Sequence, residues 1–286
     1  MRFLRLRVAL CGALAVLIAV AVWAARRPAE RPPDAVTADV TGSPHPAASA
    51  GVGALPQPSA ARSSGADPGG LRYSFDFDEG FDGGSDGTIA DTGGRLPLRV
   101  RRAQGGTITA VPHDGGLAVR FPPRCEHYGA ESCARAILQS GPADFLNPGR
   151  LPFSYGASIL VKSSETSKGA NVVQKGFSVG DSQFKLQVDG AAGRPSCVIV
   201  GNAGPAIHVA LASRTVADGR WHRVECSRGD SLLTVAVDGI VVGRTAIPSS
   251  LSIANSDPLC IGGKGTSANN DQFVGAIDDV FVTRGA

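Results

Sequence analysis

The chain has 286 residues, of which 43% are hydrophobic, 19% are charged and only 6% are aromatic. Seven of the 28 basic residues and four of the 25 acidic residues precede Leu71, so the remainder carries equal numbers of acidic and basic side chains. This balance gives no electrostatic reason to expect a nucleic-acid partner.

The first 27 residues have the pattern of an export signal or a membrane anchor. Three arginines precede an uncharged apolar run at residues 8–25, and Arg26 and Arg27 follow it. The run has nearly the length of a membrane-spanning helix, and basic residues before it favour an N-terminus inside the cell. We therefore predict a single-pass anchor at residues 1–27 that holds the folded part outside the cell. The alternative is a signal peptide cleaved near Val22-Trp23-Ala24, which would release a secreted protein.

Residues 28–70 are rich in Pro, Ala, Ser and Gly and contain few large apolar side chains. Such a segment cannot bury enough surface to offset its conformational entropy, and its prolines favour an extended spacer. We predict a disordered linker here, followed by one folded domain over residues 71–286.

From Leu71 onward, apolar residues alternate with polar ones in short runs that Gly, Asp, Asn and Pro interrupt. Clear examples are the segments Phe153–Lys162, Gln183–Asp189 and Ser231–Asp238. A period of two is typical of β-strands with one buried face. Asp238-Gly239 then predicts a tight hairpin turn, because glycine accepts positive φ. Many short strands at near-regular spacing indicate an all-β sandwich or barrel.

Three segments carry a family resemblance. The first reads Tyr73-Ser-Phe-Asp-Phe-Asp-Glu-Gly80 and is followed by Asp91-Thr-Gly-Gly94. The second reads Asp218-Gly-Arg-Trp-His-Arg-Val-Glu-Cys226 with Leu233-Thr-Val-Ala-Val-Asp-Gly239, and the third reads Phe273-Val-Gly-Ala-Ile-Asp-Asp-Val-Phe-Val282. In this order, they resemble the laminin-G-like, concanavalin A-like lectin/glucanase superfamily. The resemblance implies a jelly-roll β-sandwich of two antiparallel sheets, with the first and last strands adjacent. The Gly-, Ala-, Val- and Arg-rich composition suggests a high-GC genome of the actinobacterial type.

The resemblance also implies a partner for a buried carboxylate. We expect Asp278 to share a strand face with Val280 and Val282, where an unpaired carboxylate would be costly. The family pattern implies a cation or backbone amides beside the first strand-turn, where acidic residues including Asp91 gather. Because calcium binds oxygen ligands, we predict one structural calcium with Asp91 and Asp278 among its neighbours. The alternative is a solvated acidic turn.

Five of the six cysteines follow the apolar run that contains Cys11. Disulfides persist in exported proteins. We predict that Cys125–Cys133 closes a polar loop and that Cys197–Cys226 joins two apolar runs that could be neighbouring strands. Cys260 is then free and is expected to be a buried, inert thiol. Other pairings remain open from the sequence.

Glycoside hydrolysis needs two carboxylates that face each other across a sugar. The Glu-x-Asp-x-x-Glu strand of the superfamily's laminarinase-like enzymes does not occur in this sequence. We therefore predict no catalysis, but a cell-surface binding module for a glycan or a protein. The alternatives are a glycoside hydrolase of extracellular or cell-wall polysaccharide and a structural envelope domain.

Ligand contacts are expected in two loops at the rim of the sandwich, residues 126–132 and 263–272. Their side chains can hydrogen-bond to hydroxyl groups or stack on sugar rings. The candidate contact residues are His127, Tyr128, Asn269, Asn270 and Asp271.

Overall fold

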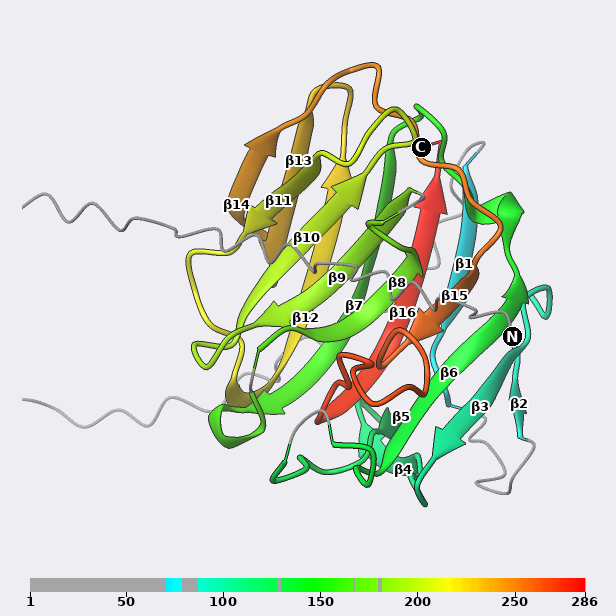
Figure 1. Cartoon of the computed structure of the whole chain (residues 1–286), viewed down its shortest axis with the longest axis vertical. Helices are drawn as coiled ribbons and strands as arrows, with labels where there is room; N and C mark the ends of the chain where they lie inside the picture. Colours follow the sequence, from blue (N-terminus) through cyan, green and yellow to red (C-terminus); the bar gives the residue numbers. More distant parts are fainter. Residues whose placement is uncertain (1–69, 79–86, 128–129, 167, 180–181, 286) are drawn as a thin grey trace, which may run out of the picture. The chain divides into compact units, whose positions relative to one another are not determined.

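Two eight-stranded antiparallel sheets build the part of the chain that the computed structural model describes, residues 70–78, 87–127, 130–166, 168–179 and 182–285 (Figure 1). Within these ranges no helix has the length and hydrophobicity needed to cross a membrane. The predicted anchor at residues 1–27 lies outside these ranges, as does nearly all of the predicted linker.

The two sheets are named A and B. Along the chain, successive strands or groups of strands belong by turns to one sheet and to the other. Sheet A has the order β14-β13-β12-β7-β16-β5-β4, and β1 also pairs with β16. Its strands are β1 (Leu71–Phe75), β4 (Thr109–His113), β5 (Gly116–Arg120), β7 (Phe153–Lys162), β12 (Asp218–Arg228), β13 (Leu232–Val237), β14 (Ile240–Ala246) and β16 (Ala276–Arg284).

Sheet B has the order β11-β10-β9-β8-β15-β6-β3-β2. Two short 3₁₀ helices, η1 (Asp144–Leu146) and η2 (Ser163–Glu165), lie in the connections on either side of β7. The strands of sheet B are β2 (Thr88–Ile89), β3 (Leu98–Ala103), β6 (Arg135–Pro142), β8 (Ala170–Gly176), β9 (Gln183–Asp189), β10 (Arg194–Val200), β11 (Ile207–Leu211) and β15 (Pro258–Ile261).

The alternation seen in the sequence places the core between the sheets. Tyr155 of β7 and Phe184 of β9 are fully buried from opposite sheets, and their ring centroids lie 5.0 Å apart. The Tyr155 hydroxyl also donates to the Lys185 carbonyl at 3.2 Å, so the buried phenol keeps a hydrogen-bond partner. Burial of each such side chain stabilises the fold by about 1.5–3 kcal/mol. The bounds of β7 and β9 equal those predicted from the sequence.

The chain closes on itself through its first and last strands. Tyr73 and Phe75 of β1 lie opposite Val282 and Val280 of β16. The adjacency that the family resemblance implied is therefore confirmed. Together the two antiparallel sheets form the predicted jelly-roll sandwich.

A β-bulge in β16 corrects the expected position of Asp278. The pairing of β16 with β7 shifts between Asp278 and Phe281, and Asp279 has a φ of 47°. Asp278 consequently lies opposite Ser158, whose neighbours in β7 point into the core. The extra residue of a bulge moves the following side chains to the other face. Asp278 is therefore buried on the outer face of sheet A, whereas Val280 lies on the core face.

Both predicted disulfides are present. Cys125–Cys133 closes the loop before β6, with 5.7 Å between the two Cα atoms. Cys197–Cys226 joins β10 of sheet B to β12 of sheet A. The expectation of neighbouring strands was wrong, because the bridge crosses the core between the sheets. Cys260 is a free, buried cysteine, and burial raises the pKa of its thiol to about 11.

Candidate functional site

A row of side chains crosses the outer face of sheet B, one from each of five adjacent strands. The pairings run from Arg99 (β3) to Gln139 (β6), then to Cys260 (β15), Gln174 (β8) and Lys185 (β9). These residues point outward because their sequence neighbours, such as Leu138 and Phe184, are fully buried in the core. Figure 1 shows the five strands side by side in the sheet nearest the viewer. We call this set the cross-strand row.

A recess opens at the middle of the cross-strand row. Gln139, Gln174 and Cys260 line it together with residues at the strand ends and in the adjoining loops, namely Gly176, Phe177, Asp257, Pro258 and Lys264. Its volume is about 170 Å³. One water molecule needs about 10–15 Å³ by the same measure, so the recess has room for a larger polar group. Phe177 is exposed at its border and offers an aromatic ring.

A chain of amides fixes the polar groups beside the recess. Gln174 donates through Nε2 to the Gly176 carbonyl at 2.7 Å, which leaves its Oε1 to accept from Asn171 Nδ2. The carbonyl acceptor therefore sets the orientation of both side-chain amides. Asn171 is fully buried, and its Oδ1 has no hydrogen-bond donor among the residues that the structure describes. The face thus keeps an unused buried acceptor next to the cross-strand row.

The loop at residues 263–272 follows β15 directly and lies beside the start of β8, where the Gly262 amide donates to the Val172 carbonyl at 3.0 Å. Lys264 pairs with Asp271 at 2.7 Å, and the Asp271 carbonyl accepts from the Asn171 amide at 2.9 Å. Of the three contact residues predicted here, only Asn269 is exposed. Asn270 is 2% exposed and donates to the Gly265 carbonyl, which gives it a structural contact, and its role as a ligand contact stays a prediction.

The second predicted loop lies beside the first. His127 is exposed, whereas Tyr128 lies outside the described residues. A small cavity is lined by the Cys125–Cys133 bridge on one side and by Ala268 and Asn270 on the other. It leaves only about 20 Å³ for the centres of water molecules, which is room for about one water. Among the described residues, the two loops therefore meet at a cavity of about one water molecule.

The two carboxylates predicted to share a calcium have different partners. Asp91 accepts from the backbone amides of Arg95 at 2.5 Å and Leu96 at 2.6 Å, so backbone amides, the alternative to a cation, satisfy it. Asp278 contacts His113 Nδ1 at 2.5 Å. Burial raises the pKa of Asp278 to about 6, while the hydrogen bond with His113 opposes that rise.

One group of side chains among the described residues could hold a cation, and it contains Asp278 but not Asp91. Ligand atoms of His113, Asp278 and Asp279 lie within 4.8 Å of one another. Calcium prefers six to eight oxygen ligands, whereas this group offers an imidazole already bonded to a carboxylate. The donor set does not fit calcium well, and a structural calcium at Asp91 and Asp278 remains a prediction.

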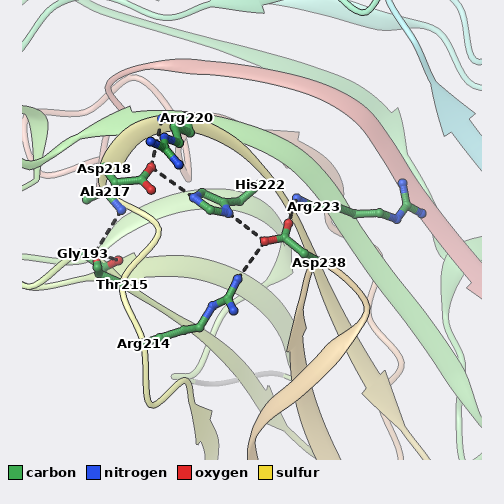
Figure 2. Close-up of polar contacts among 9 residues, drawn as sticks. All are labelled: Gly193, Arg214, Thr215, Ala217, Asp218, Arg220, His222, Arg223 and Asp238. Atoms are coloured by element: carbon green, nitrogen blue, oxygen red, sulfur yellow. Dashed lines mark hydrogen bonds and ion pairs between the residues drawn. The ribbon is translucent and has the colours of Figure 1, made fainter. Parts of the chain in front are cut away.

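A third polar cluster surrounds His222 at the start of β12 (Figure 2). Asp238 Oδ2 accepts from His222 Nδ1 at 2.9 Å and from Arg214 at 2.7 Å, and Asp238 Oδ1 accepts from the Arg223 amide at 3.0 Å. His222 Nε2 lies 3.1 Å from Asp218 Oδ1. The Arg220 amide lowers the pKa of Asp218, and His222 adds to this effect. Carboxylates occupy both ring nitrogens, so the imidazole faces no nucleophile and the cluster supports the β12–β13 hairpin.

Sequence reasoning missed the cross-strand row. The alternation in Gln183–Asp189 already placed Lys185 and Gln187 on the face opposite the core. The neighbours of Lys185 across the sheet come from strands far away in the sequence, so no local pattern could group them.

Comparisons with known proteins agree with this architecture. Residues 145–286 match a family model described as the concanavalin A-like lectin/glucanases superfamily. Among solved structures, the fold is similar to domain 4 of AbnA, a GH43 extracellular arabinanase from Geobacillus stearothermophilus solved in complex with arabinotriose. That match has a TM-score of 0.53 and 14% identity, and it covers 75% of this chain and 92% of that domain.

Two toxin binding domains have a similar fold. The binding domain of Paraclostridial Mosquitocidal Protein 1 gives a TM-score of 0.52 at 13% identity, covering 75% of this chain and 49% of that one. The binding domain of botulinum neurotoxin DC, solved with rat synaptotagmin II, gives a TM-score of 0.51 at 12% identity. That match covers 73% of this chain and 47% of the toxin chain. The chain thus spans about half the length of these two domains. A search of curated protein sequences finds no match to it.

Proposed function

Because residues 145–286 belong to the concanavalin A-like lectin/glucanase superfamily, we propose that the chain is a non-catalytic binding module for a glycan and that it binds through the outer face of sheet B. The observation that carries this proposal is the cross-strand row with the recess at its centre. Fold likeness alone would not suffice, since one scaffold serves many functions.

The chemistry of the row suits sugar hydroxyls. A side-chain amide both donates and accepts hydrogen bonds, as a hydroxyl group does. Gln139 and Gln174 both line the recess, and Gln139 is half-buried there. The exposed ring of Phe177 supplies an apolar surface at the border. The arabinanase domain with its arabinotriose adds support, since a domain of similar fold holds a short sugar chain.

Binding without cleavage is favoured because the carboxylates near the row are already engaged. Asp189 accepts from Gln187 and Ser196, and Asp271 pairs with Lys264. A glycosidase would need one of its carboxyl groups to be available as an acid and a second as a base or nucleophile. A hydrolase would reveal itself by new reducing ends when the purified chain is incubated with the polymer that it binds.

The test is a glycan array on the full-length chain, followed by calorimetry with the best ligand. We expect Gln139→Ala to weaken binding at least tenfold, because it removes an amide at the recess. Asn269→Ala should bind like the wild type, although Asn269 lies on the loop beside this face. Equal binding by the Gln139→Ala variant, with an unchanged melting temperature, would contradict the proposed face. The absence of any glycan ligand would contradict the function itself.

A further inference from the structure

We propose that the glycan bound by this face is anionic, a polysaccharide whose sugar units carry carboxylate or sulfate groups. This inference rests on the proposed function and deepens it. The folded part of the chain has equal numbers of acidic and basic residues, so the argument depends on where the charges lie and on which of them are already paired.

Three basic side chains on the outer face of sheet B have no ionic partner. Arg99 and Arg101 alternate along β3 with the buried Leu98 and the half-buried Val100, and both arginines are exposed. Lys185 lies at the other end of the row. None of the three makes a salt bridge with a carboxylate in the described part of the chain.

The acidic groups near this face are, by contrast, committed to other contacts. Asp271 pairs with Lys264 at 2.7 Å. Asp189 accepts hydrogen bonds from Gln187 at 2.6 Å and from the Ser196 hydroxyl. Asp257, at the recess, also has an interaction partner. Lys264 balances the charge of Asp271, whereas hydrogen bonds from uncharged groups leave the charge of Asp189 in place. The three basic groups without a salt bridge still outnumber Asp189 and Asp257, so the face keeps a positive excess that attracts anions.

Lys185 gives the most specific indication. Its side chain is only partly exposed, and its ammonium group makes no hydrogen bond with a described residue. Burial lowers the pKa of Lys185, while Asp271 and Asp189 raise it without contacting the ammonium. A partly desolvated ammonium without an acceptor is unfavourable, and an anionic ligand group would supply the acceptor.

The spacing of the charges suits an extended polymer. Arg99 and Lys185 are four strands apart in the sheet. At about 4.8 Å between strands, that separation is about 19 Å, the span of several sugar units. The recess and the amides of Gln139 and Gln174 lie between the two charges. A chain lying across the strands would therefore meet a charge, then hydrogen-bonding amides, then a second charge.

The experiment uses matched polymers with the full-length chain. Polygalacturonate is compared with the same polymer after its carboxylates have been reduced to alcohols, and dextran sulfate with dextran. We expect each charged polymer that binds to do so at least tenfold more tightly than its neutral counterpart, and we expect its affinity to fall as salt rises. The polymer pair that shows the difference identifies carboxylate or sulfate as the recognised group.

Single-residue variants then locate the effect. Arg99→Gln and Lys185→Gln should each weaken binding of the charged polymer about five- to tenfold, with little change for the neutral one. Arg102→Gln is the matched control. It removes the same charge from β3, but the Arg102 side chain lies on the opposite face of the strand from Arg99 and Arg101. It should bind like the wild type.

The possible outcomes separate this inference from the proposed function. Equal binding of charged and neutral glycans would leave the binding face in place and overturn the anionic preference. Equally tight binding of a single-stranded polynucleotide would show that the face responds to charge alone, and would also overturn it. No binding of any polymer would overturn both proposals.

Discussion

The buried Asp278 and the half-buried His113 form an acid–imidazole pair on the outer face of sheet A. The His113 ring lies 3.8 Å, centroid to centroid, from Trp221, and Asp278 is 3% exposed. The bulge at Asp279 places the carboxylate there, and a strict two-residue period would have pointed it into the core. The need for a partner was therefore predictable from the sequence, but its identity was not. A single inserted residue in a strand changes the sheet face on which a side chain lies, and therefore the residues that it contacts.

This pair should make stability depend on pH. Burial raises the pKa of Asp278 to about 6, above its ordinary value of 3.8. The folded state then holds the proton more tightly than the unfolded chain, so this group stabilises the fold below about pH 4 and loses that contribution as pH rises through 6. Relative to wild type, Asp278→Asn should gain about 1–3 kcal/mol between pH 4 and pH 7. Urea unfolding across this range measures it, with Asp144→Asn as the exposed control. Parallel pH profiles for wild type and Asp278→Asn would contradict the prediction.

At the scale of elements, the β12–β13 hairpin is held by one residue of its turn. Asp238 and Gly239 have φ values of 53° and 78°, as a tight hairpin turn requires. The Asp238 carboxylate also binds Arg214, His222 and the Arg223 amide (Figure 2). The turn was predictable because its two-residue signature is local. The contacts of the Asp238 carboxylate were not predictable from the sequence, since Arg214 lies outside the hairpin.

Asp238→Ala should destabilise the fold by about 1–2 kcal/mol, because it removes three hydrogen bonds, two of them to side chains that can carry charge. Asp238→Asn should lose less than half as much, since asparagine tolerates positive φ and can still accept from the Arg223 amide. Thermal unfolding at pH 7 compares the two variants. Equal losses would show that the side-chain acceptor contributes little.

The two disulfides should differ in their contributions because they close loops of different length. Cys197–Cys226 spans 29 residues and joins the two sheets, whereas Cys125–Cys133 spans 8. In the chain-entropy model, the longer loop stabilises by about 1 kcal/mol more. Denaturant unfolding of the paired Cys→Ala variants should therefore rank the inter-sheet bridge first, with Cys260→Ala as a control that breaks no bridge. The reverse ranking would contradict this order.

At the scale of the whole molecule, features set by residues close in the sequence could be predicted, whereas contacts between residues far apart in the sequence could not. The bounds of β7 and β9 followed from the alternation within each strand. The neighbours Gln139, Gln174 and Cys260 come from β6, β8 and β15, with more than 80 residues between the last two. Only the order of strands in sheet B brings them together. The candidate binding face is therefore a property of the topology, and the predicted contacts in the rim loops remain a separate, untested prediction.

The closure of the sandwich by β1 leads to the last prediction. Tyr73, Phe75 and Phe77 are at most 7% exposed, and β1 pairs with β16 along its full length. Each buried aromatic stabilises by about 1.5–3 kcal/mol, so their joint loss is comparable to the entire stability of a typical domain. A fragment that begins at Leu71 should therefore unfold cooperatively, whereas one that begins at Glu79 should be unfolded or aggregated, because the edge of β16 and the core beneath β1 would be exposed.

Circular dichroism and thermal unfolding of the two fragments give the test, and the inter-sheet disulfide provides a check. If the shorter fragment still forms Cys197–Cys226 and melts within a few degrees of the longer one, β1 is a dispensable edge strand. If it does not, β1 and β16, which lie almost the length of the domain apart in the sequence, must pair before sheet A is complete. Such distant pairing should also slow folding, because a long loop has to close before the contacts form.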